Sequence, residues 1–141
     1  MKVSARNAFS GTIAKVTKGA VNAEVLLTTT GGDQIAASIT NGSVETLALK
    51  EGVTAVALVK ASWVILGKGL DASKISTRNV LSGTINNIRD GAVNSEVEVK
   101  LSGGTILIAM VTVGSVQRMQ LVVGEQVSAV FKASSVIIAV E

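Results

Sequence analysis

The chain repeats itself along most of its length. Residues 4–69 align with residues 76–141 without a gap, and 28 of the 66 aligned positions are identical. Periods of about 20–50 residues are typical of solenoids and propellers, whereas this longer period has the size of a small domain. The repeat therefore predicts two domains in tandem, at 1–69 and 76–141, joined by a linker at 70–75.

Each unit has the pattern of a β-domain. In the first unit, short segments rich in Val, Ile and Thr are separated by glycine-containing turns, and they lie at 9–16, 23–29, 34–40, 54–60 and 62–66. Residues 42–52 form the only helix-like segment, in which Ser43 is the expected N-cap and Val44, Leu47 and Leu49 can face inward. Five strands with a short helix between the third and the fourth are typical of the OB-type barrel, with an SH3-like barrel as the alternative. We therefore predict an all-β fold of two tandem OB-type five-stranded Greek-key barrels, each with one short helix.

The composition excludes several kinds of chemistry. The chain has no Cys and no His. A disulfide framework, a zinc site with thiolate or imidazole ligands and a Ser-His-Asp triad are therefore impossible. Lys, Asp and Glu could still act as acids or bases, but the composition favours a binding protein over an enzyme. We expect no metal cation held directly by side chains.

The apolar residues are dispersed through short segments. No apolar run approaches the roughly 18 residues of a membrane-spanning helix. The first nine residues also lack the apolar core of a secretory signal. We therefore expect a cytoplasmic protein without a membrane partner. Since 48% of the residues are apolar and each unit is small, the apolar excess indicates either packing between the two units of one chain or oligomerisation, and we expect a homo-oligomer.

Charged residues differ between the two copies at most positions. Of 13 cations, only three pairs stay in register, and among the acids only one pair does: Lys2/Lys74, Arg6/Arg78, Lys60/Lys132 and Glu24/Glu96. Arg6 and Lys60 also keep their neighbours, in the patterns Ser-x-Arg-Asn and Lys-Ala-Ser. Solvated surface charge has drifted, so the retained cations mark candidate functional positions.

The retained residues are hydrogen-bond donors. Arg supplies a planar fork of N–H groups, Lys a compact ammonium and Ser a hydroxyl. Thr40 and Ser43 add hydroxyls at the start of the expected helix. Together these residues predict a pocket for a small oxyanion. The structural alternative is that Arg6 and Lys60 pair with Glu24 and that the small residues only form turns.

Oligonucleotide binding is the alternative function, because OB-type barrels often bind oligonucleotides. Such modules stack bases on aromatic side chains in a basic groove. This chain has no Tyr, one Trp and two Phe, and Trp63 is replaced by Ser135 in the second copy. A net charge of +3 is only a weak attraction for anions. We therefore expect no nucleic-acid partner.

The conserved pattern between the copies resembles a known family. Ser4-Ala5-Arg6-Asn7, Thr40, Gly42-Ser43-Val44, Leu49, Gly52 and Lys60-Ala61-Ser62 are similar to the molybdate-binding Mop domain. Two such domains in one chain resemble the molbindins. The resemblance implies an OB-type fold, molybdate or tungstate as ligand, and a role in storage or homeostasis of the oxyanion. It also implies homotrimers with binding sites between Mop units, where the Ser-Ala-Arg-Asn segment of one unit meets the Lys-Ala-Ser segment of a neighbour.

The resemblance also assigns residues. The implied molybdate ligands are Ser4, Ala5, Arg6, Lys60, Ala61 and Ser62, and their copies Ser76, Thr77, Arg78, Lys132, Ala133 and Ser134. Further donors are expected at Thr40, Ser43, Thr112 and Ser115. A second kind of site near a symmetry axis is expected at Ala20, Val21, Asn22, Ala92, Val93 and Asn94. The second copy departs from the pattern at Thr77, which stands where the first has Ala5.

Overall fold

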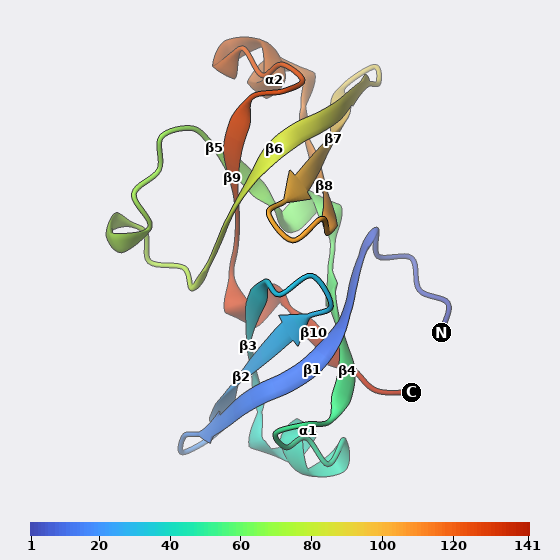
Figure 1. Cartoon of the computed structure of the whole chain (residues 1–141), viewed down its shortest axis with the longest axis vertical. Helices are drawn as coiled ribbons and strands as arrows, with labels where there is room; N and C mark the ends of the chain where they lie inside the picture. The colour runs from blue at the N-terminus through green and yellow to red at the C-terminus, as the bar shows by residue number, and fades with distance from the viewer.

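Two five-stranded antiparallel sheets, one above the other in Figure 1, make up the chain, and the computed structural model describes all of residues 1–141. The first sheet contains β1 (Asn7–Lys18), β2 (Asn22–Thr29), β3 (Gln34–Thr40), β4 (Thr54–Val59) and β10 (Ile137–Ala139). The second sheet contains β6 (Asn79–Asp90), β7 (Asn94–Leu101), β8 (Ile106–Thr112), β9 (Gln126–Phe131) and β5 (Ile65–Gly67). In each sheet the first strand of the repeat lies between the second and the fourth. The predicted all-β fold with two five-stranded units is confirmed.

The two repeats exchange their last strands. β5 pairs with β9, where Leu66 lies opposite Ala129, and β10 pairs with β4, where Ile138 lies opposite Ala57. The exchange is visible in Figure 1, where the red end of the chain enters the lower sheet beside β4. Each repeat therefore contributes four strands to one sheet and one strand to the other.

Inward-facing and solvent-facing residues alternate along the strands, as expected for a sheet with one buried face. Along β1 the residues Asn7, Phe9, Gly11 and Ile13 face inward and their neighbours face solvent. After Ile13 the register with β2 shifts, and the same shift follows Ile85 in β6. Such bulges strengthen the local twist and help a sheet to curl. The inward side chains form one core of small aliphatic residues that runs through both sheets and includes both phenylalanines.

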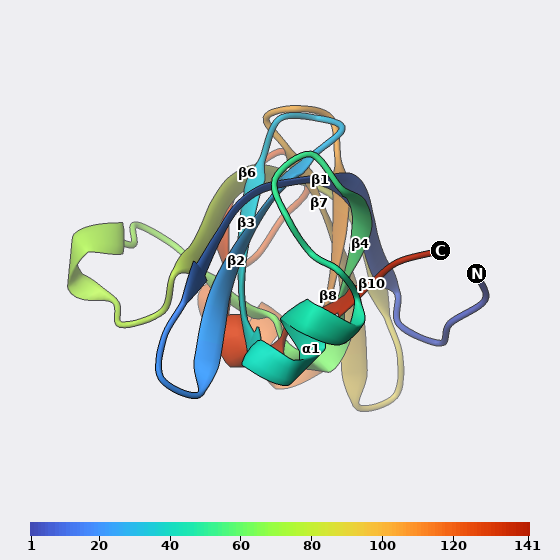
Figure 2. The ribbon, with the colours of Figure 1, turned by 90° about the horizontal axis from the view of Figure 1, so that it is seen from below.

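One short α-helix follows the third strand of each repeat. These are α1 (Asn41–Thr46) and α2 (Val113–Met119), which lie at opposite ends of the molecule (Figure 1). In the view from below, α1 lies in front of the strands (Figure 2). The N-cap of α1 is Thr40, whose Oγ1 accepts a hydrogen bond from the Ser43 N–H at 3.0 Å. The prediction of Ser43 as N-cap was therefore wrong by three residues, because a Thr three positions earlier offers the same capping oxygen. Val44 and Leu49 are buried as expected.

Three short 3₁₀ turns complete the chain. They are η1 (Ala61–Trp63), η2 (Ala72–Lys74) and η3 (Ala133–Ser135). The turns η1 and η3 occupy positions where the sequence predicted the beginning of a fifth strand. The turn η2 lies in the expected linker, which loops away from both sheets (Figures 1 and 2).

Buried asparagines join the two repeats. Asn79 Nδ2 donates to the Ala36 carbonyl oxygen at 2.8 Å, and its Oδ1 accepts from the Ala36 N–H at 2.8 Å. Asn7 makes the equivalent pair with Ile108, at 2.8 and 2.7 Å. Both asparagines are almost fully buried, with 1% and 2% of Asn7 and Asn79 exposed. Each side-chain amide thus satisfies the outward backbone groups of an edge strand in the other repeat.

Glycine pairs meet where the repeats adjoin. Gly32 and Gly104 have φ of 91° and 90°, which side chains rarely adopt, and they complete the β2–β3 and β7–β8 turns. The preceding glycines, Gly31 and Gly103, touch each other: a Cβ added to Gly103 would lie 1.9 Å from the Gly31 carbonyl oxygen. The repeated Gly-Gly therefore serves a turn and a close backbone contact.

We predict that Asn79→Ala destabilises the protein. The substitution leaves the buried N–H and C=O of Ala36 without partners, which costs about 2 kcal/mol of unfolding free energy. Asn87→Ala, on the exposed side of the same strand, is the matched control and is expected to change stability by less than about 0.5 kcal/mol. Urea unfolding of both variants measures the difference. Equal midpoints for the two variants would contradict the role given to Asn79.

Candidate functional site

All six molybdate ligands that the resemblance implies in the second repeat line one cavity. The cavity has a volume of ≈ 290 Å³ and is lined by Ser38, Ser76, Thr77, Arg78, Lys132, Ala133 and Ser134. Ser38 is the one member that the sequence did not indicate, and it comes from β3 of the first repeat. We call this the Arg78 cavity.

Strand pairing brings the two segments of the Arg78 cavity together. β6 begins at Asn79 and β9 ends at Phe131, and these two residues lie opposite each other in the sheet. The segment before β6 and the segment after β9 must therefore lie side by side. Thr77 fixes them further, because its Oγ1 donates to the Phe131 carbonyl oxygen at 2.7 Å. The Ser-x-Arg and Lys-Ala-Ser segments of the same repeat are thus neighbours within one chain.

The lining of the Arg78 cavity is made of donors. It contains a guanidinium, an ammonium and several hydroxyls, and no carboxylate. The first backbone N–H groups that are hydrogen-bonded in η3 are those of Ser135 and Val136, which donate to the carbonyl oxygens of Lys132 and Ala133. The N–H groups of Ala133 and Ser134 therefore remain free for a ligand. Such a set of donors suits an oxyanion that carries no proton.

Both retained arginines form ion pairs across the repeats. Arg78 Nη1 donates to Glu24 Oε1 at 2.6 Å, and Arg6 donates to both carboxylate oxygens of Glu96, at 2.6 and 2.9 Å. The alternative that paired Arg6 with Glu24 was therefore wrong, because the partner lies in the other repeat. About half of each arginine side chain is exposed, 53% for Arg6 and 55% for Arg78. Exposed pairs of this kind add little stability, and their donors stay accessible to a ligand.

The first repeat has a different cavity around its predicted residues. Three of them, Ser4, Ala5 and Lys60, line a space of ≈ 450 Å³ together with Val3, Leu58, Trp63 and Ile137. We call this the Trp63 cavity. Lys60 Nζ lies 5.8 Å from the centroid of the Trp63 ring, which is within the range of a cation–π contact. Arg6, Ala61 and Ser62 do not line it. The two copies of the predicted site are therefore chemically unlike.

The remaining predicted residues lie elsewhere, at the two ends of the molecule. The hydroxyls of Thr40 and Ser43 are 2.9 Å apart, and those of Thr112 and Ser115 are 2.8 Å apart, so they are engaged in capping α1 and α2. The Asn41 N–H donates to the Val21 carbonyl oxygen at 2.9 Å, and Val113 and Val93 make the equivalent bond. The expected axial segments 20–22 and 92–94 therefore adjoin the helix caps rather than the arginines. Val21 and Val93 are strongly exposed, at 72% and 71%.

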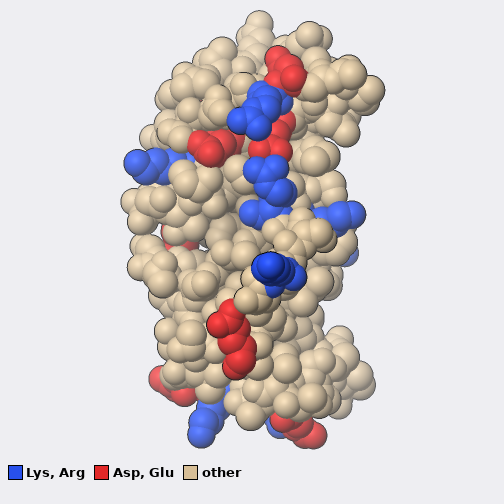
Figure 3. All heavy atoms as spheres, turned by 90° about the vertical axis from the view of Figure 1, so that its right-hand side faces the viewer, with Lys and Arg blue, Asp and Glu red and all other residues tan.

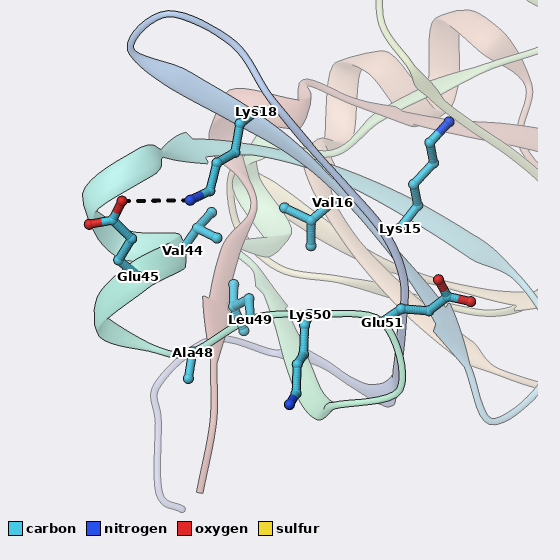
Figure 4. A pocket seen from close by; sticks show the side chains of 9 residues that line it. All are labelled: Lys15, Val16, Lys18, Val44, Glu45, Ala48, Leu49, Lys50 and Glu51. Carbon is cyan, nitrogen blue, oxygen red and sulfur yellow. Dashed lines mark ion pairs between the residues drawn. The ribbon is translucent and has the colours of Figure 1, made fainter.

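A further cavity is lined by none of the residues that were predicted to bind the anion. It has a volume of ≈ 560 Å³ and lies between β1 and α1, with Val16, Val44 and Leu49 at its centre (Figure 4). Lys18 and Glu45 form an ion pair of 3.6 Å at its rim. The three lysines that line it are Lys15, Lys18 and Lys50, and the second repeat replaces them by Asn87, Asp90 and Val122. The three lysines of this groove are therefore a feature of the first repeat only.

Two carboxylates in the structure have lowered pKa values, and both belong to the linker contacts. Hydrogen bonds from the Ser73 hydroxyl and backbone N–H lower the pKa of Asp71. A hydrogen bond from the Lys68 ammonium lowers the pKa of Glu125. Asp71 lies in the linker and Glu125 directly before β9, and neither carboxylate lines the Arg78 cavity or the Trp63 cavity.

The surface charges are mixed. On the face shown in Figure 3, cationic side chains gather across the middle, and acidic side chains lie above and below them. No helix of the chain has the length and apolarity needed to cross a membrane. The chain also has no cluster of three or more Asp or Glu that could hold a metal ion.

Comparison with known proteins gives one domain family and several relatives. The TOBE-domain family matches the chain twice, at residues 3–66 and 75–138. A solved structure of the cytoplasmic molybdate-binding protein ModG, with molybdate bound, superposes with a TM-score of 0.93; it is 48% identical and each chain covers 100% of the other. The chain is 38% identical over 141 residues to the molybdenum transport protein ModE of Herbaspirillum seropedicae. It is 41% identical over 139 residues to the molybdenum-pterin-binding protein MopA of Rhodobacter capsulatus. These two matches include 100% and 99% of this chain, but the chain spans only about half of each relative's length, 52% in both cases.

Proposed function

This chain belongs to the TOBE-domain family as a tandem of two such domains, and we propose on that premise that it binds molybdate or tungstate and keeps the oxyanion in store. The resemblance to the molbindins is confirmed by the two domain matches and by the likeness to ModG along the whole chain. We place the proposed function in the cytoplasm, where the similar protein ModG is found. We propose a binding protein without catalytic activity.

The two cations and the hydroxyls that line the Arg78 cavity are the observation that carries this proposal. Molybdate is fully deprotonated at neutral pH, so all of its oxygens accept hydrogen bonds from such donors. The one carboxylate beside the cavity, Glu24, accepts from Arg78 and would share that guanidinium with a bound anion. The free N–H groups of Ala133 and Ser134 add neutral donors beside Arg78 and Lys132. In the proposed complex, the hydroxyls of Ser76 and Ser134 complete the set of donors, because the Thr77 hydroxyl already donates to the Phe131 carbonyl oxygen.

The oligonucleotide alternative has less support. A base-stacking surface needs several exposed aromatic rings, whereas Trp63 is the single aromatic side chain in either cavity and already contacts Lys60. Acidic side chains also lie on both sides of the cationic ones in Figure 3, whereas a groove that binds oligonucleotides is basic along its length.

We propose that the chain forms a homotrimer. Exposed aliphatic side chains on the short exchanged strands support self-association: Ile65 of β5 is 64% exposed and Ile137 of β10 is 54% exposed. β5 and β10 are also edge strands of their sheets. The number three comes from the family resemblance.

Native mass spectrometry with and without molybdate tests function and assembly together. We expect the mass of three chains, with an added mass that corresponds to bound molybdate when the anion is present. Sulfate at the same concentration is the comparison anion. A monomer at micromolar concentration in both conditions would contradict the proposed trimer, and an unchanged mass in molybdate would contradict the proposed ligand.

We predict that Arg6→Ala and Arg78→Ala each weaken molybdate binding. Each removes a charge-assisted donor worth about 1.5–3 kcal/mol against a bound anion. The fold should persist, because both ion pairs are half exposed. Lys100→Ala is the control, because it removes the same charge from an exposed position that lines neither cavity. Calorimetry that shows wild-type affinity and stoichiometry in the double arginine variant would reject the assignment.

We predict that molybdate affinity changes less than tenfold between about pH 6 and 8. The proposed donors are guanidinium, ammonium, hydroxyl and backbone N–H groups, whose ordinary pKa values lie outside this range. The chain has no His, the side chain that usually titrates there. Titration of molybdate at several pH values and constant ionic strength measures the dependence. A larger change would mean that a group outside this set controls the site.

A further inference from the structure

We propose that Ser38 donates a hydrogen bond to the oxyanion in the Arg78 cavity, and that residues 38 and 110 make the two sites of the chain unequal. This inference rests on the proposed function. It adds a binding residue from the first repeat to a cavity otherwise built by the second.

The register places Ser38 beside the ion pair of the cavity. Ser38 lies directly opposite Glu24 in the pairing of β2 and β3, and Glu24 accepts the hydrogen bond of Arg78. The side chain is half-buried and lines the cavity together with Ser76 and Ser134. The neighbouring hydrogen bonds use Arg78, Glu24 and Asn79 with Ala36, and none of them uses the Ser38 hydroxyl. This hydroxyl is therefore free to donate.

The equivalent position in the other repeat holds Met110. Met110 lies opposite Glu96 in the pairing of β7 and β8, and Glu96 accepts the hydrogen bonds of Arg6. The turn η1 adjoins β8 as η3 adjoins β3, so the surroundings correspond as well. A serine at one site is thus matched by a methionine at the other.

The two side chains have opposite effects on an anion. A serine hydroxyl is a short donor, whereas a methionine thioether has no N–H or O–H to donate and is longer by two heavy atoms. Met110 therefore takes space and offers no donor where an oxyanion beside Arg6 would lie. Neither Arg6 nor Met110 lines the Trp63 cavity, so no cavity of the first repeat joins Arg6 to Lys60 as the Arg78 cavity joins Arg78 to Lys132. The Arg78 site is expected to bind molybdate more tightly than the Arg6 site.

Reciprocal substitutions test the inference. Ser38→Ala should weaken the tighter class of molybdate sites about tenfold, the effect of losing one hydrogen bond to a charged group. Ser38→Met should weaken it further, and Met110→Ser should strengthen the weaker class. Ser128→Ala, which removes a half-buried strand hydroxyl that lines neither cavity, is the control and should bind as the wild type does.

Isothermal titration calorimetry of the full chain with sodium molybdate is the measurement, and thermal unfolding without the anion checks that each variant folds. A wild type that binds no molybdate would overturn the proposed function itself. A wild type that binds molybdate, with Ser38→Ala and Met110→Ser both unchanged in affinity, would overturn the role of residues 38 and 110 and leave the function standing. Should Ser38→Met fail to fold, the alanine variant still decides.

Discussion

The hydrogen bonds of Asn7 and Asn79 connect the two halves of this molecule. Each side-chain amide is buried and pairs with both backbone groups of one edge-strand residue in the other repeat. An unpaired amide in the same place would be costly, so the two halves are held in one relative position. The exchanged strands β5 and β10 depend on that position, because each must reach the edge of the opposite sheet.

The same asparagines place the candidate binding residues. Asn79 begins β6 and follows Arg78 directly, so anchoring its side chain to β3 also fixes the segment 76–78 beside the first repeat. Arg78 then reaches Glu24, and Ser38 faces the same cavity. The Ser-x-Arg-Asn pattern thus combines two tasks in consecutive residues, a structural link at the Asn and a donor at the Arg. This explains why the pattern is retained in both copies while most charges have changed.

Much of the architecture was predictable because the sequence is duplicated. Alternation within short Val- and Ile-rich segments predicted the strands, and comparison of the copies singled out Arg78 and Lys132 with their retained neighbours. The family resemblance then gave the full set Ser76, Thr77, Arg78, Lys132, Ala133 and Ser134, which does line one cavity. Whether these residues bind molybdate stays a prediction. The helix start was misplaced because Thr40 and Ser43 offer the same kind of capping oxygen.

Two features could not be predicted from the sequence. The strand exchange was invisible, since β5 and β10 have similar sequences and either sheet satisfies their hydrogen bonds. Ser38 could not be found from residues identical in both copies, because residue 38 is one of the positions where the copies differ. A difference between copies at a shared structural position is thus as informative as an identity.

The cation–π contact of Lys60 with Trp63 gives the molecule an internal optical probe. Trp63 is the only tryptophan, and its ring lies 5.8 Å from an ammonium that belongs to the predicted residues of the first repeat alone. Nearly half of Trp63 is exposed, at 44%, so its emission depends on the charge and water around that one cavity. The second repeat has Ser135 in the corresponding position and is silent at the same wavelengths. The fluorescence of Trp63 therefore reports on an anion bound beside Lys60, whereas calorimetry measures binding to both repeats together.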